Sequence, residues 1–320
     1  MATEDYVPVA ADDWYQRRRD DAEGKFFRSV ADQGPRKGEG GATRQGIYCL
    51  TADGRLLAYK NAGQAPDVMR DVLKQGLREW QKLPADRRKA GAVKVDDPDK
   101  TDPIYSRTPP PGGLIVTVYT RILDREKGEY CKGTCKTQGG EKAARDHLWL
   151  TESEWKSLIP ADAKKGEKAP LPPKVAERIL RFHLTDNTRG EPPMWHREDV
   201  RSQELTLTVE EVTATTIRLR LDGSALLATD ADAAKADRGF DVRLLGHIGY
   251  DRATKAIDRF DVVAVGDHWG HGPHTGGARP GRSPLGVVFE LAGGKSAADL
   301  VPPQWAREIN NYFGRDRTRE

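Results

Sequence analysis

Three histidines lie close together in the segment 267–274 (DHWGHGPH). They are His268, His271 and His274, and they follow an apolar stretch that is typical of a buried strand. Neutral imidazole is a common ligand of zinc and copper. A loop rich in glycine and proline can fold several such side chains around one ion, so the pattern predicts a copper or zinc site. The alternative is an exposed loop whose histidines are hydrogen-bonded or solvated.

Two cysteines, Cys131 and Cys135, form a second candidate ligand set. Thiolates at this spacing can reach one soft metal ion, or each other, if the loop between them turns. His147 follows in the chain and is a candidate third ligand. The alternatives are a structural disulfide between the cysteines in an oxidising compartment, and a hydrogen-bonded, partly buried histidine at position 147.

The cysteine spacing resembles that of the copper sites in cytochrome-oxidase-type domains and in the thioredoxin-fold copper chaperones that serve them. In those proteins a distant histidine completes the ligand set. The resemblance therefore implies a copper site made by Cys131, Cys135 and His147. The residues around the cysteines, such as Lys132 and Lys136, are not part of that family's pattern.

Arginines beside the histidine segment indicate a different ligand. Arg279 and Arg282 lie in the segment 277–282 (GARPGR). Guanidinium groups form strong paired hydrogen bonds with carboxylates and phosphates. We therefore expect Arg279, Arg282 and the nearby Trp269 to contact an anionic ligand.

Other chemistries lack a recognisable motif. The sequence has neither the GxSxG turn of a serine nucleophile nor a phosphate-binding loop followed by Lys-Ser or Lys-Thr. Whether the chain is an enzyme stays open at this point. If it is one, the candidate ligands favour a metal-dependent oxidoreductase.

The strands and helices that position these residues can be predicted from the spacing of apolar residues, which changes along the chain. From residue 204 onward apolar and polar residues alternate, as at Leu205, Thr206 and Leu207. This alternation predicts five or six antiparallel strands with one solvated face, arranged as a small barrel or sandwich. A helix is expected over residues 304–313.

The first 83 residues have a different pattern. They predict a strand over 6–10, a helix containing Phe26 and Phe27, a hairpin over 46–59 and a helix that begins at Pro66. This order resembles the later part of a thioredoxin-like domain. The family's redox motif, two cysteines separated by two residues, is absent, and residues 43–45 (TRQ) replace the proline that precedes its hairpin. The resemblance therefore implies a scaffold or docking module without redox chemistry.

These patterns predict four parts and an α+β fold. The parts are a thioredoxin-like module without its redox motif (1–83), a Pro-rich linker (84–113), a mixed α/β segment with the cysteine pair (114–200), and an antiparallel β barrel or sandwich with the histidine segment and a C-terminal helix (201–320).

The composition argues against several classes of protein. Of 320 residues 37% are hydrophobic, and no apolar run approaches the ~20 residues of a membrane helix, so no integral membrane segment is expected. The formal charge of +3 lacks the one-sided basic character of a nucleic-acid binder, so no nucleic-acid partner is expected. The small-molecule or protein partner is not identified. The N-terminus has no signal-peptide pattern, which predicts a cytoplasmic protein, or a periplasmic or secreted one if a leader has been removed.

Two functional hypotheses follow. The first is a copper- or zinc-binding protein that uses the three histidines of segment 267–274, with the cysteine pair and His147 as a second or converging set. If the sets converge, copper-dependent redox chemistry or copper handling follows, because thiolate with imidazole suits copper. The second is a non-catalytic ligand-binding or protein-interaction module in which Cys131 and Cys135 form a structural disulfide.

Overall fold

The computed structural model describes residues 1–38, 42–61, 65–89, 101–102, 104–105, 107–123, 143–294 and 296–313. The chain divides into two units, Met1–Arg107 and Thr108–Glu320, and each is considered by itself. Among the described residues, no helix has the length and apolar character needed to cross a membrane.

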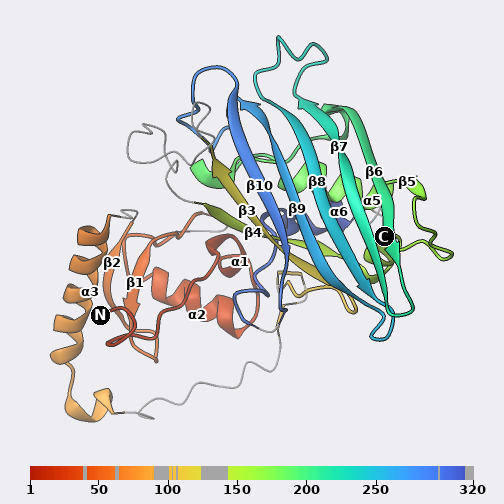
Figure 1. Ribbon diagram of the computed structural model, residues 1–320. Helices are drawn as coiled ribbons and strands as arrows, with labels where there is room; N and C mark the ends of the chain where they lie inside the picture. The colour runs from red at the N-terminus through yellow and green to blue at the C-terminus, as the bar shows by residue number, and fades with distance from the viewer. Residues whose placement is uncertain are drawn as a thin grey trace, which may run out of the picture. The chain divides into compact units, whose positions relative to one another are not determined.

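The first unit is built from helices and one hairpin (Figure 1). Its elements are α1 (Asp13–Gln16), α2 (Ala22–Ala31), β1 (Ile47–Leu50), β2 (Leu56–Lys60), α3 (Pro66–Gln81) and the short helix η1 (Ala85–Arg88). β1 and β2 pair antiparallel, and α3 packs on the hairpin around Cys49, Ala58 and Val72. Gly76 permits this close approach, since a Cβ at that position would lie 2.6 Å from the Cβ of Cys49.

The prediction that this unit is a thioredoxin-like module is wrong. In the described residues of this unit the hairpin β1–β2 is the only sheet. Residues 7–10 form no strand, and Val7 and Val9 are 89% and 81% exposed. The apolar residues suggested a buried strand, but Pro8 between them has no N–H to give to a sheet.

The second unit contains a large antiparallel sheet (Figure 1). The strands follow the order β4-β3-β10-β9-β8-β7-β6-β5. Their bounds are β3 (Leu114–Ile122), β4 (Ala144–Leu150), β5 (Lys168–Pro170), β6 (Val200–Val212), β7 (Thr216–Ala228), β8 (Gly239–Asp251), β9 (Ala256–Trp269) and β10 (Ser283–Leu291).

The prediction of a β barrel or sandwich is also wrong, because this sheet is open. β4 forms one edge and β5 the other, and it is the only sheet within the described residues of this unit. β3 pairs with β10, so strands from residues 114–200 and from 201–320 share one sheet. Alternation of polar and apolar residues predicts that one face of a sheet is buried, but does not say what buries it.

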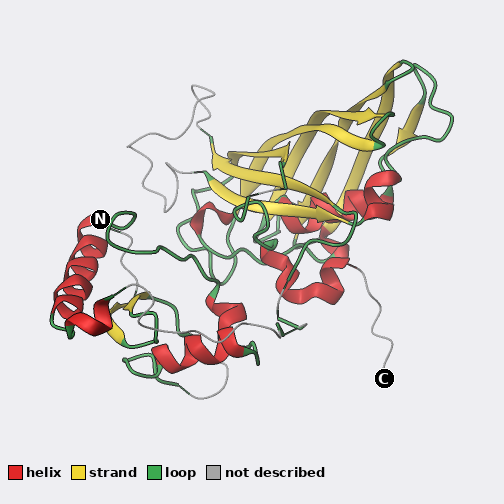
Figure 2. Ribbon diagram, turned by 90° about the horizontal axis from the view of Figure 1, so that it is seen from below, coloured by secondary structure: helices red, strands yellow, loops and turns green. Residues whose placement is uncertain are grey.

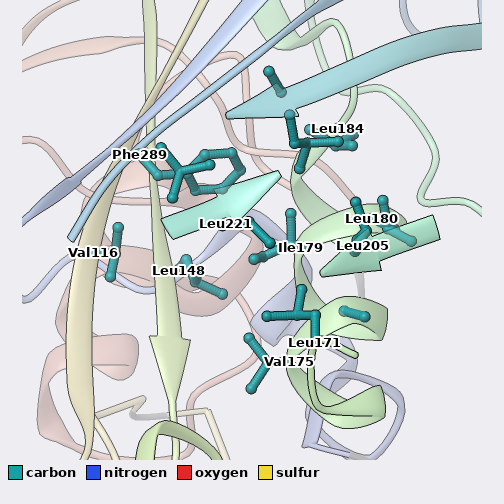
Figure 3. Close-up of a cluster of buried hydrophobic side chains, with 14 of the residues drawn as sticks. Val116, Leu148, Leu171, Val175, Ile179, Leu180, Leu184, Leu205, Leu221 and Phe289 are labelled. Atoms are coloured by element: carbon teal, nitrogen blue, oxygen red, sulfur yellow. The ribbon is translucent and has the colours of Figure 1, made fainter. Parts of the chain in front are cut away.

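Helices bury one face of the sheet (Figure 2). They are α4 (Glu152–Lys156), α5 (Pro173–Arg178), η2 (Ile179–His183), η3 (Asn187–Arg189), η4 (Arg197–Asp199), η5 (Gln304–Glu308) and α6 (Ile309–Phe313). Figure 3 shows the core that results: Ile179 and Leu180 lie among Leu205, Leu221 and Phe289. Proline at the start of α5 and a Thr151–Glu154 capping box at the start of α4 fix where these helices begin.

Candidate functional site

His268 lies on strand β9 and not in a loop, and its side chain is buried. It lines a small cavity together with Asp186, Arg189, Trp269 and Arg279. The cavity measures about 10 Å³, which is room for about one water molecule. The structure therefore brings three predicted site residues together, His268, Trp269 and Arg279, in a space too small for an organic substrate.

The electrostatics of this cavity keep the His268 ring neutral. Burial lowers the pKa of His268 to about 4, and the nearby arginines act in the same direction against the opposing charge of Asp186. Burial raises the pKa of Asp186, but the hydrogen bond from Thr188 and the ion pair with Arg189 outweigh that effect, so the net pKa lies below its ordinary value. At neutral pH the cavity thus contains an ionised carboxylate beside an uncharged imidazole.

Arg189 holds the segment that follows β9. Its Nε lies 2.6 Å from Oδ2 of Asp186, and its Nη atoms donate to the carbonyls of Gly270 (3.1 Å), Thr275 (2.5 Å) and Gly276 (3.2 Å). Both Asp186 and Arg189 are buried. Arg189 therefore has a structural role, because its guanidinium group connects Asp186 to the backbone of residues 270–276.

A glycine lets the two loops approach each other. Gly190 has a φ of 143°, and a Cβ at this position would lie 2.2 Å from the carbonyl oxygen of His274. Any other residue would push residues 270–276 away from Arg189.

The two arginines predicted to bind an anion, Arg279 and Arg282, also make their contacts within the protein. Arg279 donates to the carbonyls of Leu123 (2.7 Å) and Pro284 (2.6 Å). Arg282 stacks over the ring of Trp269 at 4.1 Å, with Asp241 at 3.8 Å. The anionic ligand therefore stays a prediction, and the cavity that Trp269 and Arg279 line has room for about one water molecule.

The remaining predicted metal ligands lie elsewhere. His271 and His274 are exposed and do not line the cavity. Cys131 and Cys135 lie outside the described residues. In the part of the chain that the structure describes, no group of three or more His, Cys, Asp or Glu side chains could hold a metal ion.

His147 lies on β4, 3% exposed, and neither ring nitrogen has a hydrogen-bond partner of good geometry. Burial lowers its pKa, with a smaller contribution in the same direction from Arg145; Asp146, Asp299 and a backbone interaction with Val301 oppose it. The residue is a neutral, buried imidazole under the C-terminal segment.

A second buried polar cluster secures that C-terminal segment. The Tyr312 hydroxyl lies 3.0 Å from Nε2 of His183 and accepts from the backbone N–H of Trp149 (3.1 Å). Nδ1 of His183 lies 3.2 Å from Asp146. Burial raises the pKa of Tyr312, so its hydroxyl stays protonated. Tyr312, His183 and Trp149 are all buried, so these contacts fix the C-terminal helices to the sheet.

The open face of the sheet carries the feature that sequence reasoning missed. Leu245, Val263, Val265 and Val288 are exposed by 50%, 44%, 43% and 39%, and we call them the open-face patch. Leu245 lies opposite Val263, and Val263 lies opposite Val288, so the patch crosses β8, β9 and β10. The sequence signal was present: the apolar run 262–265 (VVAV) breaks the alternation of β9.

A groove accompanies the patch on its β8 side. It measures about 510 Å³, and Leu245, Val263 and Val265 line it together with charged or titratable residues, namely Asp222, Arg243, His247 and Asp261. The open face thus combines an apolar centre with a charged rim.

The chain was compared with protein-family models, with curated proteins and with solved structures, and no match was found in any of the three. The functional argument therefore rests on these sites alone.

Proposed function

We propose that this chain is a non-catalytic interaction protein and that its second unit binds a polypeptide partner through the open face of its sheet. The open-face patch carries this proposal. A sheet with one buried face ordinarily presents polar residues on the other. Here four aliphatic side chains are exposed side by side on the solvated face.

The composition of the face supports a macromolecular partner. Contiguous exposed apolar patches with polar rims mark interaction sites on soluble proteins. Interfaces between proteins share this anatomy of an apolar centre and a polar border. The cavity at His268, by contrast, has room for about one water molecule, and its arginines are used in contacts within the protein.

Site-specific photo-crosslinking tests this proposal. A benzophenone amino acid in place of Val263 should form adducts with a defined polypeptide in an extract of the producing organism. The same group at Val301, which is exposed outside the patch, should not give those adducts. If position 263 yields no polypeptide adduct beyond those of position 301, the proposal fails.

Copper or zinc binding remains a second candidate, favoured by one observation. Because the pKa of His268 is held near 4, its imidazole is neutral at physiological pH, which is the form that binds metals. His271 and His274 follow on the adjacent exposed segment. A ligand set made of all three would require that segment to move.

Elemental analysis distinguishes the candidates. Protein purified without a histidine tag would be loaded with one equivalent of copper or zinc and desalted. Near-stoichiometric metal that is lost in a His271→Ala/His274→Ala variant would support this second candidate. Equal retention by wild type and variant, or no retention by either, would exclude a site built on these two residues.

A further inference from the structure

We propose that the outer edge of strand β4 is a second binding surface of this unit, which takes an extended strand of a polypeptide partner. The C-terminal segment 296–313 has to move away for that strand to bind, and we call this segment the strap. The edge of β4 is separate from the open-face patch, so the inference stands independently of the proposed function.

The backbone of β4 directs hydrogen-bonding groups outward along this edge. Within the described residues, β4 pairs with β3 alone. The Trp149 N–H donates to a side chain of the strap rather than to β3. The carbonyl of Ile115, which lies opposite Trp149, accepts from Ala292 on the far side of β3. Because alternate residues of an antiparallel strand direct their backbone groups to the same side, those of Arg145, His147 and Trp149 point away from the sheet.

The strap covers this edge without pairing to it as a strand. Within the described residues, its hydrogen bonds to β4 all involve a side chain: Asp299 with Arg145 at 3.0 Å, the Gln304 N–H with Asp146 at 3.0 Å, and the Tyr312 hydroxyl with Trp149 at 3.1 Å. Pro302 and Pro303 lie within the stretch 299–304 and have no N–H to give to a neighbouring strand. The outward backbone groups of Arg145 and His147 are therefore left for another strand.

Buried polar atoms weaken the contact between the strap and β4. Both ring nitrogens of His147 and the indole nitrogens of Trp149 and Trp305 are buried, and within the described residues they have no hydrogen-bond partner of good geometry. Such groups lose their hydrogen bonds to water and gain none in return, which offsets part of the stabilisation from apolar packing. The strap therefore leaves β4 at a lower cost than a segment with fully paired polar groups.

The strap also shows which side chains fit beside β4. It sets the carboxylate of Asp299 against Arg145, and its aromatic side chains pack in the cluster that contains Trp149. Arg145 and Trp149 are four residues apart and lie on one face of β4. An antiparallel strand that reproduces both contacts carries an aromatic residue and, four positions later, an acidic one. Backbone hydrogen bonds then supply affinity, and these two side chains supply specificity.

A synthetic peptide of this pattern tests the inference by fluorescence anisotropy with the full chain. The peptide alternates valine and threonine and carries a tyrosine four residues before a glutamate. Asp299→Ala combined with Trp305→Ala loosens the strap and should tighten peptide binding by roughly tenfold or more, because the wild-type edge is uncovered for only a fraction of the time. Asp232→Ala, which also removes an exposed ion pair, should leave the affinity unchanged.

Removal of an outward N–H tests the edge itself. His147→Pro should preserve the pairing of β4 with β3, since proline is tolerated where the N–H of a strand faces away from its sheet. In the loosened protein it should weaken peptide binding by roughly tenfold, because it removes a hydrogen bond at the centre of the added strand. His147→Val, which keeps the N–H, should not.

A peptide that is N-methylated at alternate residues removes the same hydrogen bonds without changing the protein, and it should not bind. Failure of the unmodified peptide to bind the loosened protein, or equal binding of the N-methylated peptide, overturns the inference. The strap would then serve only to protect the edge strand. Photo-crosslinking from position 263 does not depend on this edge, so a failure here is distinguishable from a failure of the proposed function.

Discussion

Leu245 lies directly opposite Val263 on neighbouring strands, and both side chains face solvent. Leu244, the residue before Leu245, is buried in the core that the helices cover. The same pair of strands is therefore apolar on both faces, but only one of these faces is covered within the second unit.

Adjacent leucines on β8 provide a matched test of this difference. Leu244→Ala should lower the free energy of unfolding by about 2–5 kcal/mol, because it leaves a cavity in the core. Leu245→Ala should change it by no more than about 0.5 kcal/mol in dilute, monomeric protein. Chemical denaturation measures both values, and equal losses would mean that Leu245 is packed.

The Tyr312 hydroxyl is predicted to hold the C-terminal helices on β4. Tyr312→Phe would leave the Trp149 N–H and Nε2 of His183 without this partner. Unsatisfied buried polar groups cost about 1–3 kcal/mol, so denaturation should show a loss in this range. Tyr119→Phe, a similar change on the open side of the sheet, serves as the control and should be nearly neutral.

Arg189 is predicted to order residues 270–276. Arg189→Met should cost about 3–5 kcal/mol, because it leaves the buried Asp186 carboxylate without its ion pair. Faster amide hydrogen exchange in residues 270–276 should accompany the loss. Adding Asp186→Asn removes the uncompensated charge and should recover part of the stability. If it recovers none, Arg189 acts only through the loop carbonyls.

His268 is predicted to make the protein less stable in mild acid. Its folded pKa of about 4 lies below the ordinary value of 6.5, so the unfolded chain binds more protons between these pH values. Stability should therefore fall as the pH falls from about 6.5 to 4, by at most about 1.4 kcal/mol per pH unit from this residue.

Denaturation midpoints across this pH window check the prediction. His268→Gln should show a shallower decline than the wild type, whatever its absolute stability. The lowered pKa of His147 contributes in the same direction, so some decline should remain. Asp186 acts in a different window, because a lowered carboxyl pKa loses its contribution only below about 3.8. An unchanged slope in His268→Gln would contradict the neutral buried imidazole.

Local patterns predicted part of this structure. The period of two correctly predicted that Leu205 and Leu207 lie on the buried face of the sheet, and both are found in the core. That pattern could not reveal whether the strands close on themselves, because closure depends on which strands pair. The pairing of β3 with β10 joins segments far apart in the sequence, and no local signal predicts it.

The candidate site, like the fold, could be predicted only in part. His268, Trp269 and Arg279 were found because they lie near one another in sequence. Asp186 and Arg189 reach the same cavity from a distant loop, so spacing alone could not associate them with His268. The open-face patch was missed for another reason: the apolar run 262–265 predicts a strand but does not say which of its side chains face solvent, and Val263 does.

The central claim is that the open-face patch is covered when the protein meets its partner, and carbene footprinting read by mass spectrometry tests it most directly. Labelling of Leu245, Val263 and Val288 should fall when an extract of the producing organism is added. Val301 should label equally throughout. Unchanged labelling of the three patch residues in the presence of the extract would contradict the account.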